Sequence, residues 1–148
     1  MQQDQPAPAG RRISDAVRAF LEQPRFAVMA TINRSGTPQL TVMWYALHPD
    51  DDVVILNTSR GLLKARNLRR DPRMSLCVED GQRYVTLEGR AELINDRAQQ
   101  EREVNDLIAP RYIGQRLGGR RWEVIQAADR IGIWLHVAQV HAYGLSTP

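Results

Sequence analysis

The sequence predicts a mainly β fold: a barrel of about six antiparallel strands with helices at its periphery. Apolar runs are short and are separated by turn residues, as at 33–36 and 79–81. Residues 83–94 alternate apolar and polar side chains, the period of a strand with one buried face. Hairpin-like connections join most of the strands, so a barrel is favoured over a doubly wound parallel sheet.

Length and composition indicate one soluble domain. The chain has 148 residues, of which 43% are hydrophobic and 25% charged, both ordinary for a globular protein. We expect a disordered tail at 1–12, rich in Gln, Pro and Ala, and a single domain at 13–148. The single cysteine, Cys77, suits a reducing compartment, and no apolar run has membrane-spanning length. A cytoplasmic protein without a membrane partner is therefore expected.

The first part of the domain predicts one helix and three strands. Ser14 is a candidate N-cap of a helix that Pro24 closes. Residues 26–32 predict a strand buried on both faces, and 38–47 predict one continuous strand in a hairpin with it. A third, short strand is predicted at 53–56.

The second part predicts three more strands. The first, at 74–78, is short and apolar. In the long strand at 83–94, Gly89 is expected to mark a bulge or a bend of the barrel. The final strand is predicted at 131–143.

Two further helices are expected between the last two strands. Asp96 and Gln99 resemble a capping box that opens the first of them. Pro110 is expected to end this helix, and a second one is predicted around 122–128. Both helices are expected to lie outside the barrel.

The segment 57–73 has an unusual local charge. Thr58 and Ser59 precede a short predicted helix at 62–68, and six cations face the single carboxylate Asp71. The cations are Arg60, Lys64, Arg66, Arg69, Arg70 and Arg73. Because a helix N-terminus is itself partly positive, an anion such as phosphate would reconcile these features. On charge alone, a solvated basic helix that keeps the protein soluble explains the segment equally well.

No side-chain catalytic machinery is predicted. His48, His136 and His141 lack metal-ligand spacing with Cys77, so no metal site is expected. Nucleophile-elbow, dinucleotide-binding and Walker motifs are not found in the sequence. A reaction here would therefore depend on a bound cofactor. The net charge of only +3 argues against a nucleic-acid partner.

Four stretches resemble a known family. They are F-A-V-M-A-T-I, G-T-P-Q-L, K-A-R-N-L-R-R-D-P-R-M-S-L and Y-V-T-L-E-G-R-A-E-L. In this order they are similar to the pyridoxamine-phosphate-oxidase-like split β-barrel flavoproteins, and most closely to the branch that uses the deazaflavin coenzyme F-420. The resemblance implies an FMN-binding type of split barrel, and a homodimer with cofactor at its interface.

The resemblance also implies cofactor contacts. Lys64 matches the lysine that binds the cofactor phosphate, and Asn67 matches another contact position one helical turn later. Thr58, Ser59 and Arg60 would form the phosphate loop, and Tyr84 would pack near the cofactor. Trp44, on the second strand, is expected at the ring pocket or the dimer interface. Lys64 as a plain surface residue, Asn67 as a helix-end hydrogen-bonding group and Tyr84 as a cross-strand packing partner remain alternatives.

The implied function is a deazaflavin-dependent oxidoreductase, which transfers hydride from the reduced coenzyme to an unsaturated small organic substrate. The alternatives are an FMN-dependent oxidoreductase, a non-catalytic deazaflavin-binding protein and a nucleic-acid binder that uses the arginines. Leu62 stands where the deazaflavin branch often has arginine, which weakens the choice of deazaflavin over FMN unless Arg60 compensates. Vitamin B6 oxidation is not expected, because the C-terminal basic motif for pyridoxal phosphate is missing.

Overall fold

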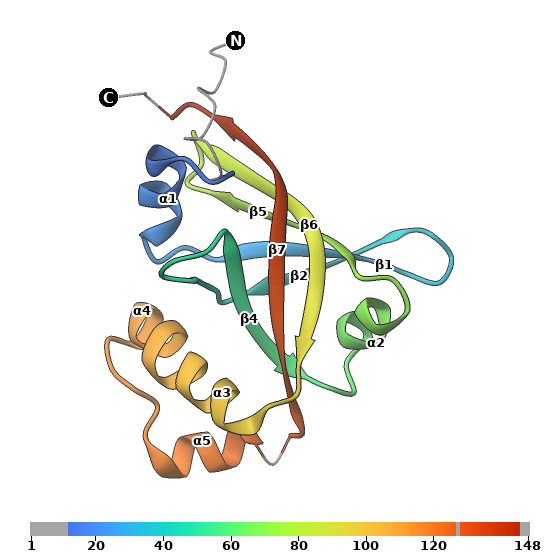
Figure 1. Ribbon diagram of the computed structural model, residues 1–148, viewed down its shortest axis with the longest axis vertical. Helices are drawn as coiled ribbons and strands as arrows, with labels where there is room; N and C mark the ends of the chain where they lie inside the picture. Colours follow the sequence, from blue (N-terminus) through green and yellow to red (C-terminus); the bar gives the residue numbers. More distant parts are fainter. Residues whose placement is uncertain (1–11, 127, 146–148) are drawn as a thin grey trace.

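Among the residues that the structure describes, seven antiparallel strands form one curled sheet in the order β2-β1-β5-β6-β7-β4-β3. The structure, a computed structural model, describes residues 12–126 and 128–145. In Figure 1 the long strands β6 and β7 run through the middle of the molecule, and α3, α4 and α5 gather at one end. The strands are β1 (Ala27–Ile32), β2 (Pro38–Met43), β3 (Ala46–Leu47), β4 (Val53–Ser59), β5 (Arg73–Glu79), β6 (Tyr84–Ile94) and β7 (Arg130–Tyr143). The predicted split-barrel class is confirmed, with seven strands in place of about six.

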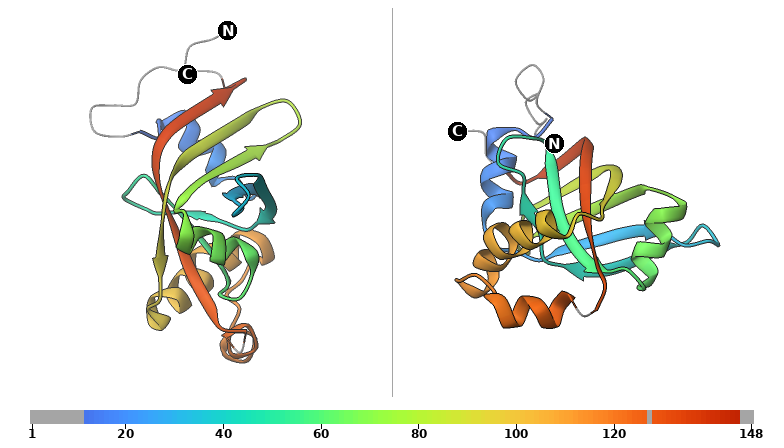
Figure 2. Two further views of the ribbon diagram at one scale, coloured as in Figure 1. Left: turned by 90° about the vertical axis from the view of Figure 1, so that its right-hand side faces the viewer. Right: turned by 60° about the horizontal axis from the view of Figure 1, so that its bottom comes forward.

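The helices pack around this sheet as predicted, with α2 on one side of it and α3 to α5 together on another (Figure 2). They are α1 (Asp15–Glu22), α2 (Leu63–Arg70), α3 (Arg97–Arg102), the π-helix η1 (Glu103–Ile108), α4 (Ala109–Ile113) and α5 (Gly119–Gln126). Both predicted caps are confirmed, because Ser14 accepts from the N–H of Val17 and Asp96 from that of Gln99.

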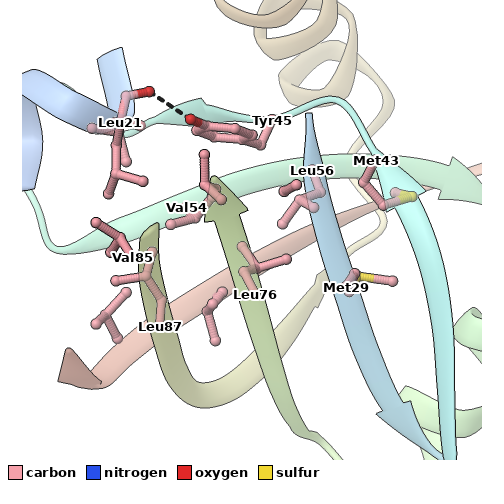
Figure 3. Packing of buried hydrophobic residues seen from close by; sticks show 14 of the residues in the cluster. Leu21, Met29, Met43, Tyr45, Val54, Leu56, Leu76, Val85 and Leu87 are labelled. Carbon is pink, nitrogen blue, oxygen red and sulfur yellow. Dashed lines mark hydrogen bonds between the residues drawn. The ribbon is translucent and has the colours of Figure 1, made fainter. Parts of the chain in front are cut away.

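The prediction of one continuous strand at 38–47 is wrong. The chain leaves β2 at Met43 and enters β3 at Ala46, and these strands form opposite edges of the sheet. Trp44 and Tyr45 lie in the gap between the edges, where the barrel is split. The Tyr45 side chain is buried, and its hydroxyl donates to the carbonyl of Leu21 at 2.6 Å (Figure 3). The residues around this break are all apolar, so the hydrophobic pattern of the sequence gave no sign of the interruption.

Two clusters of buried side chains flank the strand β4. One fills the barrel and includes Leu21, Met29 and Leu87 (Figure 3). The other lies between the outer face of β4 and the helices, and includes Val104 and Trp122. Because both of its faces are covered, the run Val53–Leu56 is buried throughout.

The strand β1 is not buried on both faces, contrary to prediction. Its residues alternate in burial, and Val28 on the outer face is 38% exposed. Because only the inner face meets the barrel core, the outer apolar side chains contribute to a surface and not to the core.

The predicted end of a helix at Pro110 is also wrong. α3, η1 and α4 follow one another without interruption to Ile113. Pro110 occupies the first turn of α4, where a proline's missing N–H is tolerated. Gly114, with φ of 71°, ends the helical run.

Gly89 marks a bulge, as predicted. The pairing of β6 with β7 shifts register between Glu88 and Gly89. A Cβ atom at Gly89 would stand 1.9 Å from the carbonyl oxygen of His136, so only glycine fits this crossing.

Most of the predicted disordered tail, 1–12, lies outside the described residues. Arg12, its last residue, is described, and its side chain donates to the carbonyl of Ala138. Within the described chain no helix is long and apolar enough to cross a membrane.

Candidate anion and cofactor site

Lys64, in the first turn of α2, is a buried cation. The residue is only 8% exposed, and no hydrogen-bond or ion-pair partner meets it among the residues described. Burial lowers the pKa of its ammonium, and repulsion from Arg130 lowers it further. Because an unpaired buried charge is unfavourable, the position is best explained by an external anion.

Arg130, the first residue of β7, provides a second cation, which is partly buried. Its Nε donates to Oδ1 of Asn57 at 2.8 Å, and its Nη1 donates to Oγ of Ser59 at 3.2 Å. Burial lowers the pKa of this guanidinium, and no carboxylate pairs with it within the described ranges. These neutral partners orient the guanidinium but do not neutralise its charge. The charge is close enough to Lys64 to repel it.

Arg130 was not among the predicted cofactor contacts, because the strand register, and not a sequence motif, brings it to the site. Arg130 stands directly opposite Ser59 in the pairing of β4 with β7, although the two are far apart in the chain. The signal in the sequence was weak: an arginine that opens a long apolar strand.

Thr58 and Ser59 do not form the predicted loop. Both belong to β4, which continues past Leu56 instead of breaking at Asn57. By strand alternation Thr58 shares the barrel-facing side with Leu56, and it is buried. Ser59 shares the opposite face with Asn57, where it meets Arg130. Of the predicted hydroxyl pair, the structure brings Ser59 alone to the cations.

Arg60 is engaged within the chain. Its side chain donates to Oδ1 of Asn95 at 2.7 Å, to Oδ1 of Asp129 at 3.3 Å and to the carbonyl of Arg130 at 3.3 Å. Asp129 itself has a positive φ of 50°. Arg60 thus ties the end of β4 to the start of β7, beside Arg130.

The amide of Asn67 joins α2 to β1. Its Nδ2 donates to Oγ1 of Thr31 at 3.1 Å and to Oδ1 of Asn33 at 3.0 Å. Its Oδ1 accepts from Nη2 of Arg70 at 3.2 Å. The side chain is fully buried, so within one chain it fixes the helix that carries Lys64.

Tyr84 lies far from the cations within one chain. It stacks on Tyr143 with ring centroids 5.4 Å apart, at the start of β6. Ile94, at the other end of β6, pairs with Gly132 near Arg130. Ten residues of strand separate the two ends, roughly 33 Å.

Trp44 forms part of an apolar pocket of about 340 Å³ that ends at Arg130. The indole is 41% exposed and stacks on Tyr112. The walls come from β2, β4, η1 and α5, and Asn57 and Arg130 are the polar lining residues. The apolar lining residues are Val42, Met43, Trp44, Val104, Ile108, Ala109, Leu117 and Ile125. This size and lining are typical of pockets for small organic ligands.

A second, polar pocket of about 240 Å³ shares Arg130 with the first as a lining residue. Arg60, Arg97 and Arg130 line it together with one carboxylate, that of Asp129. Arg130 is therefore shared by an apolar pocket and an arginine-rich one. Such an arrangement suits a ligand with a flat apolar part, a phosphate and further negative charge.

Comparison with known proteins places these features in a family. The family model described as pyridoxamine 5'-phosphate oxidase matches residues 13–144. A biliverdin reductase of Mycobacterium tuberculosis, named as dependent on reduced coenzyme F-420, is 28% identical over 120 residues, 81% of this chain and 87% of the relative.

Solved structures share the fold. A conserved hypothetical protein of Mycobacterium tuberculosis, Rv2991, has a TM-score of 0.76 and 30% identity over 93% of this chain and 88% of its own. A structure named as an F-420 reductase has a TM-score of 0.66 at 24% identity over 91% of this chain and 98% of its own, which shows the fold alone. Because the family model covers nearly the whole described barrel, the chain belongs to the pyridoxamine 5'-phosphate oxidase family.

Proposed function

We propose that this protein is a deazaflavin-dependent oxidoreductase that reduces an unsaturated small organic substrate. The observation that carries the proposal is the pair of the buried Lys64 and the partly buried Arg130, which no carboxylate of the described residues pairs with, next to an apolar pocket. The name of one relative, a biliverdin reductase dependent on reduced F-420, supports the choice of coenzyme.

The residues present fit such a cofactor. Lys64, Arg130 and the hydroxyl of Ser59 would hold the phosphate, and Trp44 would border the ring system in the apolar pocket. When bound, a reduced deazaflavin supplies hydride from ring carbon C5. The chain contributes orientation, charge compensation and a water-poor pocket, so no catalytic side chain is assigned.

The polar pocket favours a deazaflavin over FMN. FMN ends at its phosphate, whereas coenzyme F-420 continues into an acidic oligoglutamate tail. Arg60, Arg97 and Arg130 line the polar pocket, and these arginines would attract the carboxylates of such a tail. The deazaflavin branch often has an arginine at the position of Leu62. Arg130 would compensate for the loss of that cation.

A homodimer would complete the apolar pocket. Val28 pairs with Val42, and Ala30 with Leu40, on the outer face of β1 and β2. Val42 is 64% exposed although it lines the pocket, so a second copy covering this face would supply the missing wall. The same association would bring Tyr84 of the partner subunit within reach of the cofactor.

Turnover tests the proposal. Purified protein is mixed with reduced coenzyme and a panel of quinones, enones and biliverdin, and the absorbance of the reoxidised deazaflavin is followed. We expect protein-dependent reoxidation with at least one acceptor, lost in Lys64→Met. Tight coenzyme binding without turnover across the panel would instead identify a carrier protein. Turnover with FMN in place of the deazaflavin would identify the flavin-dependent alternative.

A further inference from the structure

Tyr112, on α4, closes the split between the two sheet edges. Tyr45 belongs to neither β2 nor β3, so its backbone groups are not paired in the described sheet. The Tyr112 hydroxyl accepts from the N–H of Tyr45 at 3.1 Å and donates to the carbonyl of Arg25 at 2.7 Å. The carbonyl of Tyr45 lies 3.3 Å from the same hydroxyl. One side chain thus satisfies backbone groups that a closed barrel would pair in its ladder.

The ring of Tyr112 is the middle layer of a three-ring stack. Trp44 lies on one side with centroids 4.7 Å apart, and Phe26 lies at 5.8 Å, both inclined by 10°. Trp44 is partly exposed and belongs to neither β2 nor β3. Its contact with Tyr112 is therefore the main constraint on the indole that the described residues show.

The neighbouring Arg111 anchors α4 itself. Its guanidinium donates to the carbonyls of Leu21, Glu22 and Gln23 at the end of α1. It also lies 4.8 Å from the centre of the Tyr45 ring. Tyr112 is therefore held by the hydrogen bonds of its own hydroxyl and by the anchoring of its helix through Arg111. A side chain held in this way can fix the more exposed indole of Trp44.

We propose that Tyr112 is a positioning residue of the ligand pocket and acts through Trp44. By stacking on the indole, it holds one wall of the apolar pocket in the orientation that receives a flat ring. The role of the pocket rests on the proposed function, whereas the fixing of Trp44 does not depend on any ligand. Tyr112 itself is not a lining residue of that pocket.

The ligand-free test uses fluorine NMR of protein labelled with fluorotryptophan. The Trp44 resonance is assigned with Trp44→Phe, and Trp122 and Trp134 serve as internal references. We expect a single sharp Trp44 resonance in the wild type and in Tyr112→Phe, which keeps the ring. In Tyr112→Leu it should broaden or divide while both references stay unchanged. An unchanged Trp44 resonance in Tyr112→Leu overturns the proposal. If Tyr112→Leu does not fold, Tyr112→Met takes its place.

The second test is a double-mutant cycle of deazaflavin binding. Because an aromatic pair contributes 0.5–1.5 kcal/mol, Tyr112→Leu should weaken binding about 2- to 10-fold. Tyr112→Phe should restore affinity to within about twofold. In a Trp44→Leu background, Tyr112→Leu should have no further effect, since the residue through which it acts is gone. Additive losses would show that Tyr112 acts independently of Trp44. A wild type that binds no deazaflavin refutes the proposed function, but leaves the NMR test decisive for Tyr112.

Discussion

Replacing Lys64 by methionine should weaken ligand binding and stabilise the ligand-free protein at the same time. Methionine has a similar length and keeps the packing of the lysine stem against α2. The change removes a buried ammonium that the described chain leaves without a partner. Opposite effects on binding and stability are characteristic of a residue kept for its ligand and not for the fold.

The size of the binding effect follows from the kind of interaction lost. A hydrogen bond to a charged group contributes about 1.5–3 kcal/mol, so the dissociation constant for the coenzyme should rise about 10- to 150-fold. For stability the direction follows from the lowered pKa of Lys64. Below pH 10.5 the unfolded chain holds this proton more readily than the folded one, so wild-type stability rises as the pH approaches 10.5. Lys64→Met should lack this rise, and should be the more stable protein at neutral pH.

The matched control is Arg66→Met, which removes one charge from an exposed position of the same helix. Coenzyme affinity is measured by calorimetric titration, and stability by urea unfolding of the ligand-free protein across the alkaline range. We expect the control to bind within about twofold of the wild type, because screened surface charges contribute little. Equal losses in both variants would refute a specific role for Lys64 and leave only the general charge of α2.

Three further changes test the fold and the proposed assembly. Tyr45→Phe should cost only about 0.5–1.5 kcal/mol in unfolding free energy, because Arg111 still donates to the carbonyl of Leu21. Since burial raises the pKa of Tyr45 from 10.0 to about 12, wild-type stability should fall between these pH values, and this fall should be smaller in Tyr45→Phe. Gly89→Ala places a Cβ against the backbone of β7 and should lower stability by about 3 kcal/mol, visible as an earlier urea midpoint; an unchanged midpoint would contradict the tight crossing. Val42→Glu should convert a dimer into monomers in light scattering, and a wild type that is already monomeric would refute the proposed interface.

Features set by local chemistry were predictable from the sequence. Ser14 and Asp96 cap helices because their side chains reach N–H groups three residues away, which the spacing alone reveals. Gly89 was recognisable because a glycine within an alternating strand marks a bulge or a close backbone approach. Lys64 was singled out by the resemblance of the stretch K-A-R-N-L-R-R-D-P-R to a known family, and its role at a cofactor stays a prediction.

Features decided by distant contacts were not predictable. The break at Trp44 depends on which sheet edge each neighbour joins, and strand propensity carries no such information. Arg130 joins the site through its register with Ser59, a pairing between segments far apart in the chain. Pro110 was misassigned because the π-helix before it shifts the helical register.

Parallel titrations of the wild-type protein with the deazaflavin coenzyme and with FMN would decide whether Lys64 and Arg130 serve a deazaflavin. Both ligands carry a phosphate, but only the deazaflavin extends beyond it into further negative charge. We predict micromolar or tighter binding of the deazaflavin and clearly weaker binding of FMN. Equal or tighter binding of FMN would contradict a role for the arginine-rich pocket that Arg130 lines. Binding of neither ligand would contradict the cofactor site as a whole.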